Sequence, residues 1–121
     1  MRMDIETRLS DQLGRYLDLA TSQIKLTAAN MANIDTPGYR AQGMDFEAEM
    51  RDAIDGADQG LPARQPQVRE VDGLIARPDG NNVSMDRESL NLAEAQLKFK
   101  VGVALLHVEN QRMMDAIHAD K

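Results

Sequence analysis

Apolar residues in the first third of the chain recur at alternating steps of three and four positions. This is the a/d spacing of a coiled-coil seam, and here it consists of Leu9, Leu13, Tyr16, Ala20, Ile24, Thr27 and Met31. Polar side chains occupy the other faces, as an exposed amphipathic helix requires. The pattern predicts one long helix from about Asp4 to Asn33. A stop follows at Pro37-Gly38, because proline disfavours helix at the residue before it and glycine tolerates a positive φ.

A second long helix is predicted from a cap at Ser84 to about His118. Asp86 and Glu88 fall in its first turn, where the helix dipole favours negative charge. Its apolar residues form two stripes. The first stripe contains Leu90, Ala93, Leu97, Val101, Ala104 and Val108, and the second contains Leu92, Gln96, Phe99, Val103, Leu106, Met113 and Ile117. A single partner helix cannot cover both stripes, so we expect apolar surface that other chains contact.

The segment between these helices is rich in glycine and proline and shows the helical period only once. Phe46, Met50 and Ile54 follow a possible cap at Asp45, which predicts a short helix over about residues 45–54 that ends at Asp55-Gly56. Further along, apolar residues flank Asp72-Gly73, the pattern of a weak β-hairpin over about residues 68–75.

The expected fold is mainly α, with two long terminal helices packed as a coiled-coil-like pair around this irregular middle. One structural domain is expected to contain an N-terminal helix and turn (1–39), a middle region (40–83) and a C-terminal helix (84–121).

Composition narrows the possible chemistry. The chain of 121 residues carries 20 acidic and 14 basic side chains, a net charge of -6, which disfavours a nucleic-acid partner. It has no cysteine, so disulfides and thiolate sites are excluded. No stretch approaches the length of an apolar membrane span, and the N-terminus has no apolar signal-peptide core. We therefore expect no direct membrane insertion, and no cleaved signal peptide if the protein leaves the cytoplasm.

Catalytic and metal-binding patterns are not found. His107 and His118 are about 16 Å apart along one predicted helix, too far to share a metal ion or a proton. The acidic set Asp52, Asp55 and Asp58 lacks a calcium-loop pattern. We therefore predict no catalytic residue, no metal ligand and no cofactor.

The most specific motif is the segment LTAANMANIDTPGYR at residues 26–40. Its characteristic residues are Asn30, Asn33, Thr36, Pro37, Gly38 and Tyr39. In physical terms, Asn33 can end the helix, and Pro37-Gly38 can set a tight turn that returns Tyr39 against it. The segment closely resembles the signature of the axial rod and hook proteins of the bacterial flagellum.

Two other stretches, MDFEA at 44–48 and GNNVSMDRE at 80–88, resemble the proximal-rod members of the flagellar basal-body rod family. The chain length agrees, because distal-rod and hook relatives carry much larger inserted domains. The resemblance covers about residues 9–54 and 79–117, and the loop at 57–77 matches no known pattern.

The resemblance implies a structural subunit of the proximal rod and no enzymatic activity. Such a subunit is exported by the flagellar type III apparatus, uncleaved, to the periplasmic part of the basal body. It assembles helically with copies of itself and with other rod subunits, and its expected partners include the MS-ring adaptor FliE and the export gate.

The expected assembly interface consists of Leu9, Leu13, Tyr16, Ala20, Ile24 and Met31 in the first helix and Leu90, Leu97, Phe99, Val101, Val103, Ala104, Leu106 and Val108 in the last. An alternative uses the same amphipathic helices differently. It is a soluble helical adaptor or export chaperone that closes as a symmetric bundle in the cytoplasm.

Overall fold

The computed structural model describes the backbone of residues 2–119 and the side chains of residues 8–119. Met1, Asp120 and Lys121, which belong to the expected terminal regions, lie outside the described residues. The elements within the described part are α1 (Arg2–Ala32), β1 (Gln42–Gly43), α2 (Phe46–Asp58), β2 (Arg69–Glu70) and α3 (Met85–Ala119).

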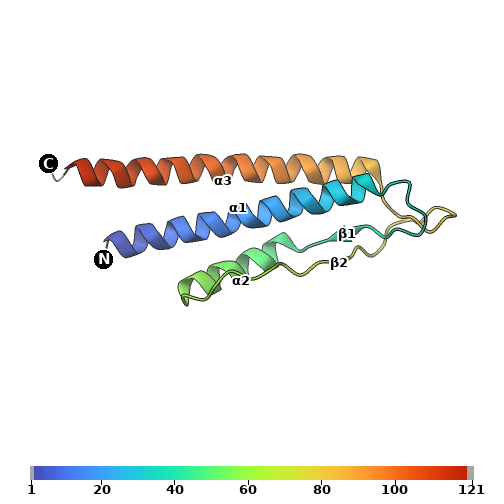
Figure 1. The fold of residues 1–121 in the computed structure, drawn as a ribbon, viewed down its shortest axis with the longest axis horizontal. Helices are drawn as coiled ribbons and strands as arrows, with labels where there is room; N and C mark the ends of the chain where they lie inside the picture. Colours follow the sequence, from blue (N-terminus) through green and yellow to red (C-terminus); the bar gives the residue numbers. More distant parts are fainter. Residues whose placement is uncertain (1, 120–121) are drawn as a thin grey trace.

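The molecule is long and narrow (Figure 1), with α1 between α3 on one side and α2 on the other. Both chain ends lie at one end of the molecule, and the turns that follow α1 and precede α3 lie at the other. The predicted fold class, mainly helical with two long terminal helices packed together, is confirmed.

Both long helices begin and end within about two residues of the predicted limits. At the end of α1, the Asn33 backbone N–H donates to the Ala29 carbonyl at 3.1 Å, and its side-chain amide donates to the same oxygen at 2.8 Å. At the start of α3, Ser84 accepts at its hydroxyl from the Arg87 N–H at 3.3 Å. The predicted cap at Ser84 and the predicted stop near Asn33 are therefore both confirmed.

The short helix α2 begins as predicted but ends later. The Asp45 carboxylate caps it by accepting from the Ala48 N–H at 3.1 Å. The expected end at Gly56 is wrong, because the helix continues to Asp58. Gly56 leaves room for a neighbour instead: a Cβ on it would lie 3.1 Å from a guanidinium nitrogen of Arg15 on α1.

A Schellman-type cap ends α2. Gly60 has a φ of +71° and donates to the Ala57 carbonyl at 3.1 Å. Leu61 donates to the Gly56 carbonyl at 2.8 Å. The chain then reverses and returns alongside α2 (Figure 1).

The predicted β-hairpin around Asp72-Gly73 is also wrong. The chain bends there and Gly73 has a φ of +79°, but β2 pairs antiparallel with β1, with Gln42 opposite Glu70. Hydrogen bonds from α1 explain this choice, because the Asn30 carboxamide binds both backbone groups of Gln42. The segment is thereby held as an extended edge, to which residues 69–71 add.

The seam between α1 and α3 is tightly packed at Gly102. A Cβ on this residue would lie 2.7 Å from Leu17 Cδ2 and 2.9 Å from Tyr16 Cδ1, so only glycine fits without movement. Ala20 of α1 and Ala95 of α3 are also buried. Small residues therefore allow the two helices to approach closely.

Neither predicted stripe forms the centre of this seam. The side of α3 toward α1 follows a regular four-three repeat through Glu88, Leu92, Ala95, Phe99, Gly102, Leu106, Glu109 and Met113, and all the buried residues of α3 belong to it. The first stripe lies on exposed surface, whereas Leu92, Phe99, Leu106 and Met113 of the second stripe belong to the repeat but are not fully buried. Sequence pattern missed the buried positions Glu88, Gly102 and Glu109 because glycine and glutamate do not register as apolar residues.

Arg15 joins α1 to α2 and to the segment after it. Its guanidinium donates to the carbonyls of Ala53, at 3.3 Å, and Leu61. Nearby, the rings of Tyr16 and Phe46 meet edge to face with centroids 5.6 Å apart, a favourable aromatic geometry. The first turn of α2 therefore packs beside the α1–α3 seam.

Two helical glycines provide a matched test of this packing. We expect Gly14→Ala to raise the free energy of unfolding by about 0.5–1 kcal/mol, because its Cβ meets no atom within 4 Å and alanine favours helix. Gly102→Ala should lower it by about 1–3 kcal/mol through overpacking against Leu17. Urea unfolding followed by circular dichroism measures both, and equal shifts of one sign would contradict the close approach.

Candidate assembly surface and the polar joint

Residues 36–39 form a tight turn after α1. The Tyr39 N–H donates to the Thr36 carbonyl at 3.2 Å. Pro37 occupies the second position and Gly38, with a φ of +76°, the third. This is the pattern of a type II turn, which requires a positive φ at its third residue. The predicted tight turn at Pro37-Gly38 is confirmed.

A second turn, at residues 77–80, stacks on the first. The Gly80 N–H donates to the Arg77 carbonyl at 2.8 Å, and Gly80 has a φ of +87°. Between the turns, the Gly38 N–H donates to the Asp79 carbonyl at 2.8 Å, and a Cβ on Gly80 would lie 3.5 Å from Gly38 Cα. The chain segment after α1 is thus fastened to the segment before α3.

Asn81 makes the most connections at this end of the molecule. Its side-chain nitrogen lies 2.9, 3.0 and 2.8 Å from the carbonyl oxygens of Asn33, Ile34 and Thr36. Its side-chain oxygen accepts from the Val83 N–H at 2.8 Å. One fully buried carboxamide therefore satisfies carbonyls just past the end of α1 and orders the entry to α3.

Asn30 performs the corresponding role from within α1. Its side-chain oxygen accepts from the Tyr39 hydroxyl at 3.1 Å and from the Gln42 N–H at 3.0 Å, and its nitrogen donates to the Gln42 carbonyl at 2.8 Å. Tyr39 therefore does return to α1, as predicted.

Arg77 and Asn82 complete the connection. Arg77 donates to the carbonyls of Val83, at 2.9 Å, and Ile34. The Asn82 side-chain oxygen accepts from the Ala41 N–H at 2.6 Å. We refer to Asn30, Arg77, Asn81 and Asn82 as the polar joint. Of these four, sequence reasoning named Asn30 and included Asn81 and Asn82 only within the family-like stretch at 80–88, without a structural role. No pattern in the sequence marked Arg77.

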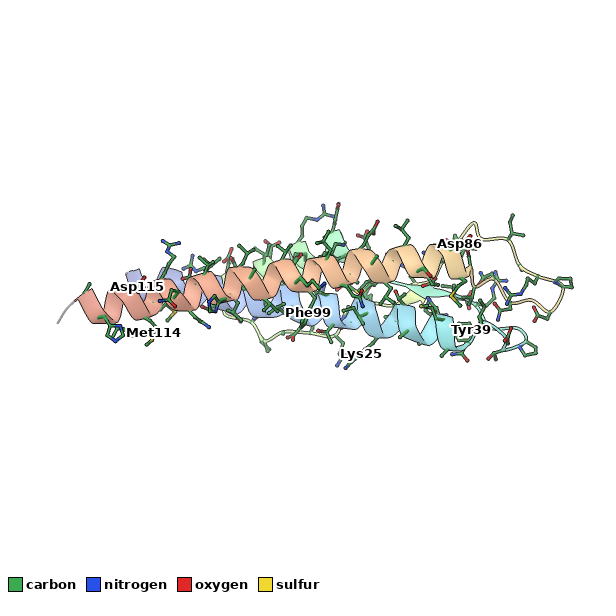
Figure 2. The ribbon with its side chains drawn as sticks, turned by 90° about the horizontal axis from the view of Figure 1, so that it is seen from above. Lys25, Tyr39, Asp86, Phe99, Met114 and Asp115 are labelled. Carbon is green, nitrogen blue, oxygen red and sulfur yellow. The ribbon has the colours of Figure 1, made fainter. Side chains whose placement is uncertain are left out.

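The first stripe of α3 remains on the surface of the subunit. We call Leu90, Ala93, Leu97, Val101, Ala104 and Val108 the outward stripe, because all six are exposed. The relative exposure of Leu97 is 63% and that of Leu90 is 61%. Figure 2 views the molecule from the α3 side, with α3 in front of α1. A contiguous apolar stripe of this kind on a helix marks a contact surface more often than scattered single residues do.

The second stripe divides between the seam and the surface. Leu92, Leu106 and Met113 are half-buried, whereas Phe99, Val103 and Ile117 are exposed. In Figure 2, Phe99 lies at the edge of α3 and not in its middle. We call Phe99, Val103 and Ile117 the flank.

The predicted interface residues of α1 are mostly enclosed within the subunit. Ala20 is fully buried, and Leu13, Tyr16, Ile24 and Met31 are half-buried, whereas Leu9 is exposed. Burial raises the pKa of the Tyr16 hydroxyl, which keeps this side chain neutral beside Gly102. The structure therefore concentrates exposed apolar surface on α3.

Other surfaces of the described residues show no arrangement that indicates a catalytic or metal-binding site. A groove of about 660 Å³ separates α1 from α2 and the segment after it, and side chains of both charge signs, such as Arg15, Asp18 and Asp52, line it. No group of three or more potential metal-ligating side chains occurs in the described part of the chain. Among the helices that the structure describes, none combines the length and apolar character needed to cross a membrane.

Two long terminal helices, tied at one end by the polar joint and carrying a large open apolar surface, define an elongated helical structural subunit. No family model matches the chain. The chain is, however, 31% identical to the flagellar basal body rod protein FlgB of Salmonella typhimurium, over 96% of this chain and 95% of that protein. It is also 31% identical to FlgB of Cereibacter sphaeroides, over 94% of this chain and 99% of that protein, and to FlgB of Escherichia coli, over 85% and 88%. The chain belongs to the FlgB family of flagellar basal body rod proteins, which confirms the resemblance found in its sequence.

The turn after α1 can be tested at Gly38. Gly38→Val should lower the free energy of unfolding by about 1–3 kcal/mol, because a β-branched residue does not adopt the observed positive φ without strain. Gly38→Asn should be milder, because asparagine tolerates the left-handed region better. Thermal melts and incorporation into purified basal bodies compare the two variants. Wild-type behaviour of Gly38→Val would rule out a role for the turn.

The polar joint can be tested at Asn81. Asn81→Ala should lower the free energy of unfolding by about 1–3 kcal/mol, because it removes the side-chain hydrogen bonds to three carbonyls after α1 and leaves the N–H of the buried Val83 without its acceptor. Asn110→Ala, on the exposed surface of α3, is the matched control and should change stability by no more than about 0.5 kcal/mol. Urea unfolding gives both values. A similar effect of the two substitutions would show that the joint does not hold the helices together.

Proposed function

We propose that this chain is a structural subunit of the flagellar proximal rod that assembles with neighbouring subunits through α3. The observation that carries the proposal is the outward stripe, on which apolar side chains such as Leu90, Leu97 and Val108 stay exposed although α3 packs along α1. Burial of apolar surface contributes about 25 cal/mol per Å², so covering this stripe supplies a strong drive for association.

The arrangement of these surfaces supports an open assembly. The outward stripe and the flank are different surfaces of the same helix. Contact between unlike surfaces of successive subunits is heterologous, and such contacts need not close into a dimer. They can instead extend as a helical tube, which is the form that a rod requires. The polar joint would keep α1 and α3 in one fixed relation, so that each subunit presents the same surfaces.

Location and partners follow from the family. We propose that the subunit resides in the periplasmic rod of the basal body, where the flagellar export apparatus delivers it. Its proposed partners are other copies, other rod subunits, the MS-ring adaptor FliE and the export gate. Support comes from the named FlgB relatives and from the open apolar surface of α3.

A charge in the outward stripe tests the proposal. Leu97→Glu should leave the fold intact, because Leu97 is exposed within the subunit. It should abolish incorporation into the rod and motility, because an unpaired charge buried at an interface costs several kcal/mol. The measurements are circular dichroism, immunoblots of purified basal bodies and swimming assays in a strain that lacks the endogenous subunit.

Gln65→Glu is the control, because it adds the same charge at an exposed position of the loop after α2. It should assemble normally. Normal incorporation of Leu97→Glu would refute assembly through the outward stripe. A fixed small oligomer of the wild-type protein at low concentration would favour the closed helical adaptor instead.

A further inference from the structure

The two edges of α3 beside the seam differ in what covers them. At one edge, the Lys98 amino group lies 4.0 Å from the centre of the Phe46 ring in α2. Phe99 follows about 100° further round the helix. It lies at the other edge, on the side of the molecule toward which Lys25 of α1 also projects (Figure 2). Phe99 and Val103 are 37% and 45% exposed there. Of the described helices and strands, only α1 packs extensively along α3, so this second edge stays uncovered.

Small residues of α1 border the same side. Thr21 and Ala28 lie four positions before and three positions after Lys25, which places all three on one face of the helix. Gly14 continues the spacing seven residues before Thr21, and a Cβ on it would meet no atom within 4 Å. Small side chains allow another helix to approach closely. We call this surface the open side, and it consists of Gly14, Thr21, Lys25 and Ala28 of α1 with Phe99 and Val103 of α3.

The outward stripe of a second copy has the form that this surface requires. From Leu90 to Val108 its residues recur at steps of three and four, the spacing with which an amphipathic helix docks on a partner. Copies in a helical tube all keep one direction relative to the tube axis, because a screw operation does not invert them. A neighbouring α3 therefore runs parallel to the α3 beside it and antiparallel to α1.

Side-chain sizes match when the two copies stand at the same height. The contact of Gly102 with Tyr16 and Leu17 fixes which residues of α1 and α3 are level. Counting equal steps from this contact, residues 90, 97 and 104 of α3 are about level with residues 28, 21 and 14 of α1. At equal height, Leu90 and Leu97 of the neighbour would thus meet two small residues of the open side.

Charges match at the same height. Glu94 and Lys98 lie along the edge of the stripe nearer α2, and in parallel copies this edge turns toward α1 of the next copy. Glu94 is then about level with Lys25, and Lys98 is within about three residues of Asp18. Among the described residues, none of these four forms an ion pair within its own subunit. Ion pairs at the rim of an interface add little affinity but select its orientation.

Shifts of one heptad set like charges together. In one direction, Glu94 becomes level with Asp18, and Arg87 becomes level with Lys25. In the other direction, Lys98 comes closest to Lys25. Like charges oppose a contact and so discriminate against a wrong alignment. Of these three alignments, the one at equal height is free of a like-charge pair.

We propose that the open side binds the outward stripe of a neighbouring copy of this chain, parallel and at about equal height, with Glu94 beside Lys25 and Lys98 beside Asp18. This inference rests on the proposed function, assembly through α3, and names the surface that receives the stripe. The stripe and the open side are different surfaces, so each copy binds one neighbour with each of them. The contact therefore continues from copy to copy around the rod axis.

A charge exchange tests the predicted pairing. Lys25→Glu should fold normally, because Lys25 is exposed, but it should lower incorporation into purified basal bodies several-fold by facing Glu94 of the neighbour. Adding Glu94→Lys to the same chain should restore incorporation. The control adds Glu70→Lys instead, which gives the same net charge at an exposed position of β2 and should restore nothing. Equal rescue by both additions, rescue by neither, or no loss in Lys25→Glu would overturn the inference.

Cross-linking tests the contact directly, because the chain contains no cysteine. Lys25→Cys and Glu94→Cys in one chain, both exposed, should react with a short bis-maleimide in isolated basal bodies and give dimers, trimers and higher multiples. Within one subunit the two positions lie on opposite sides of the α1–α3 pair. Lys25→Cys with Asp115→Cys is the matched control, because Asp115 is equally exposed but three heptads further along α3, and it should stay monomeric.

A ladder that stops at dimers would show a closed symmetric pair and overturn the inference. Monomers alone, or links only to a different protein, would overturn it as well. If Leu97→Glu blocks incorporation while the Lys25→Cys, Glu94→Cys protein gives no ladder, the stripe binds another surface, and assembly through α3 still stands. Normal incorporation of Leu97→Glu would refute the proposed function, and this inference with it.

Discussion

The close approach of α1 and α3 at Gly102 is the contact on which the rest of the structure depends. Leu17 and Tyr16 pack where any larger residue on α3 would have its Cβ. Leu92 and Leu106 are half-buried at this seam, but other bulky aliphatic side chains of α3, such as Leu90, Leu97 and Val108, are exposed. Helix α3 therefore buries little apolar surface within the subunit and leaves much of it exposed, whereas an amphipathic helix usually buries its apolar face. The outward stripe is a direct consequence of the tight seam.

The polar joint supplies hydrogen-bond partners to backbone groups at the end of the molecule where α1 ends and α3 begins. The carbonyls of the turn that follows α1 have no partner within a helix and need donors from elsewhere. Asn81 and Arg77 reach from the segment before α3 to supply donors, and Asn30 reaches out of α1 to bind the strand that follows. A single set of hydrogen bonds thus caps α1, orders the turn and orients α3. For a subunit that repeats many times, a fixed angle between its helices matters as much as the contact surface.

Helix α2 lies at the edge of the α1–α3 seam and not within it. It packs against α1 through the hydrogen bonds of Arg15, and its first turn reaches the edge of the seam, where Phe46 contacts Tyr16 of α1 and Lys98 of α3. Gly56 makes room for the Arg15 guanidinium and does not end the helix. Helix α2 therefore helps to enclose α1 within the subunit. It leaves the outward stripe uncovered, so α3 stays available to other chains.

Local signals in the sequence determined the long helices, their caps and the Thr-Pro-Gly-Tyr turn. A cap at Ser84, a stop at Asn33 and a positive φ at Gly38 each depend on residues only a few positions apart, so pattern and propensity were enough. The FlgB family was recognisable for the same reason, because its motif is a continuous segment.

Tertiary structure decided the rest. The pairing of β1 with β2, the packing of Gly56 beside Arg15 and the connections of Asn81 all join residues distant in the chain. The burial of Glu88 and Glu109 likewise depends on the packing of α3. In each case a neighbour from another element sets the role of the residue: glycine can end a helix or admit a guanidinium, and glutamate can lie in solvent or in a seam. Only the packing of α1 against α3 and α2 chooses between them.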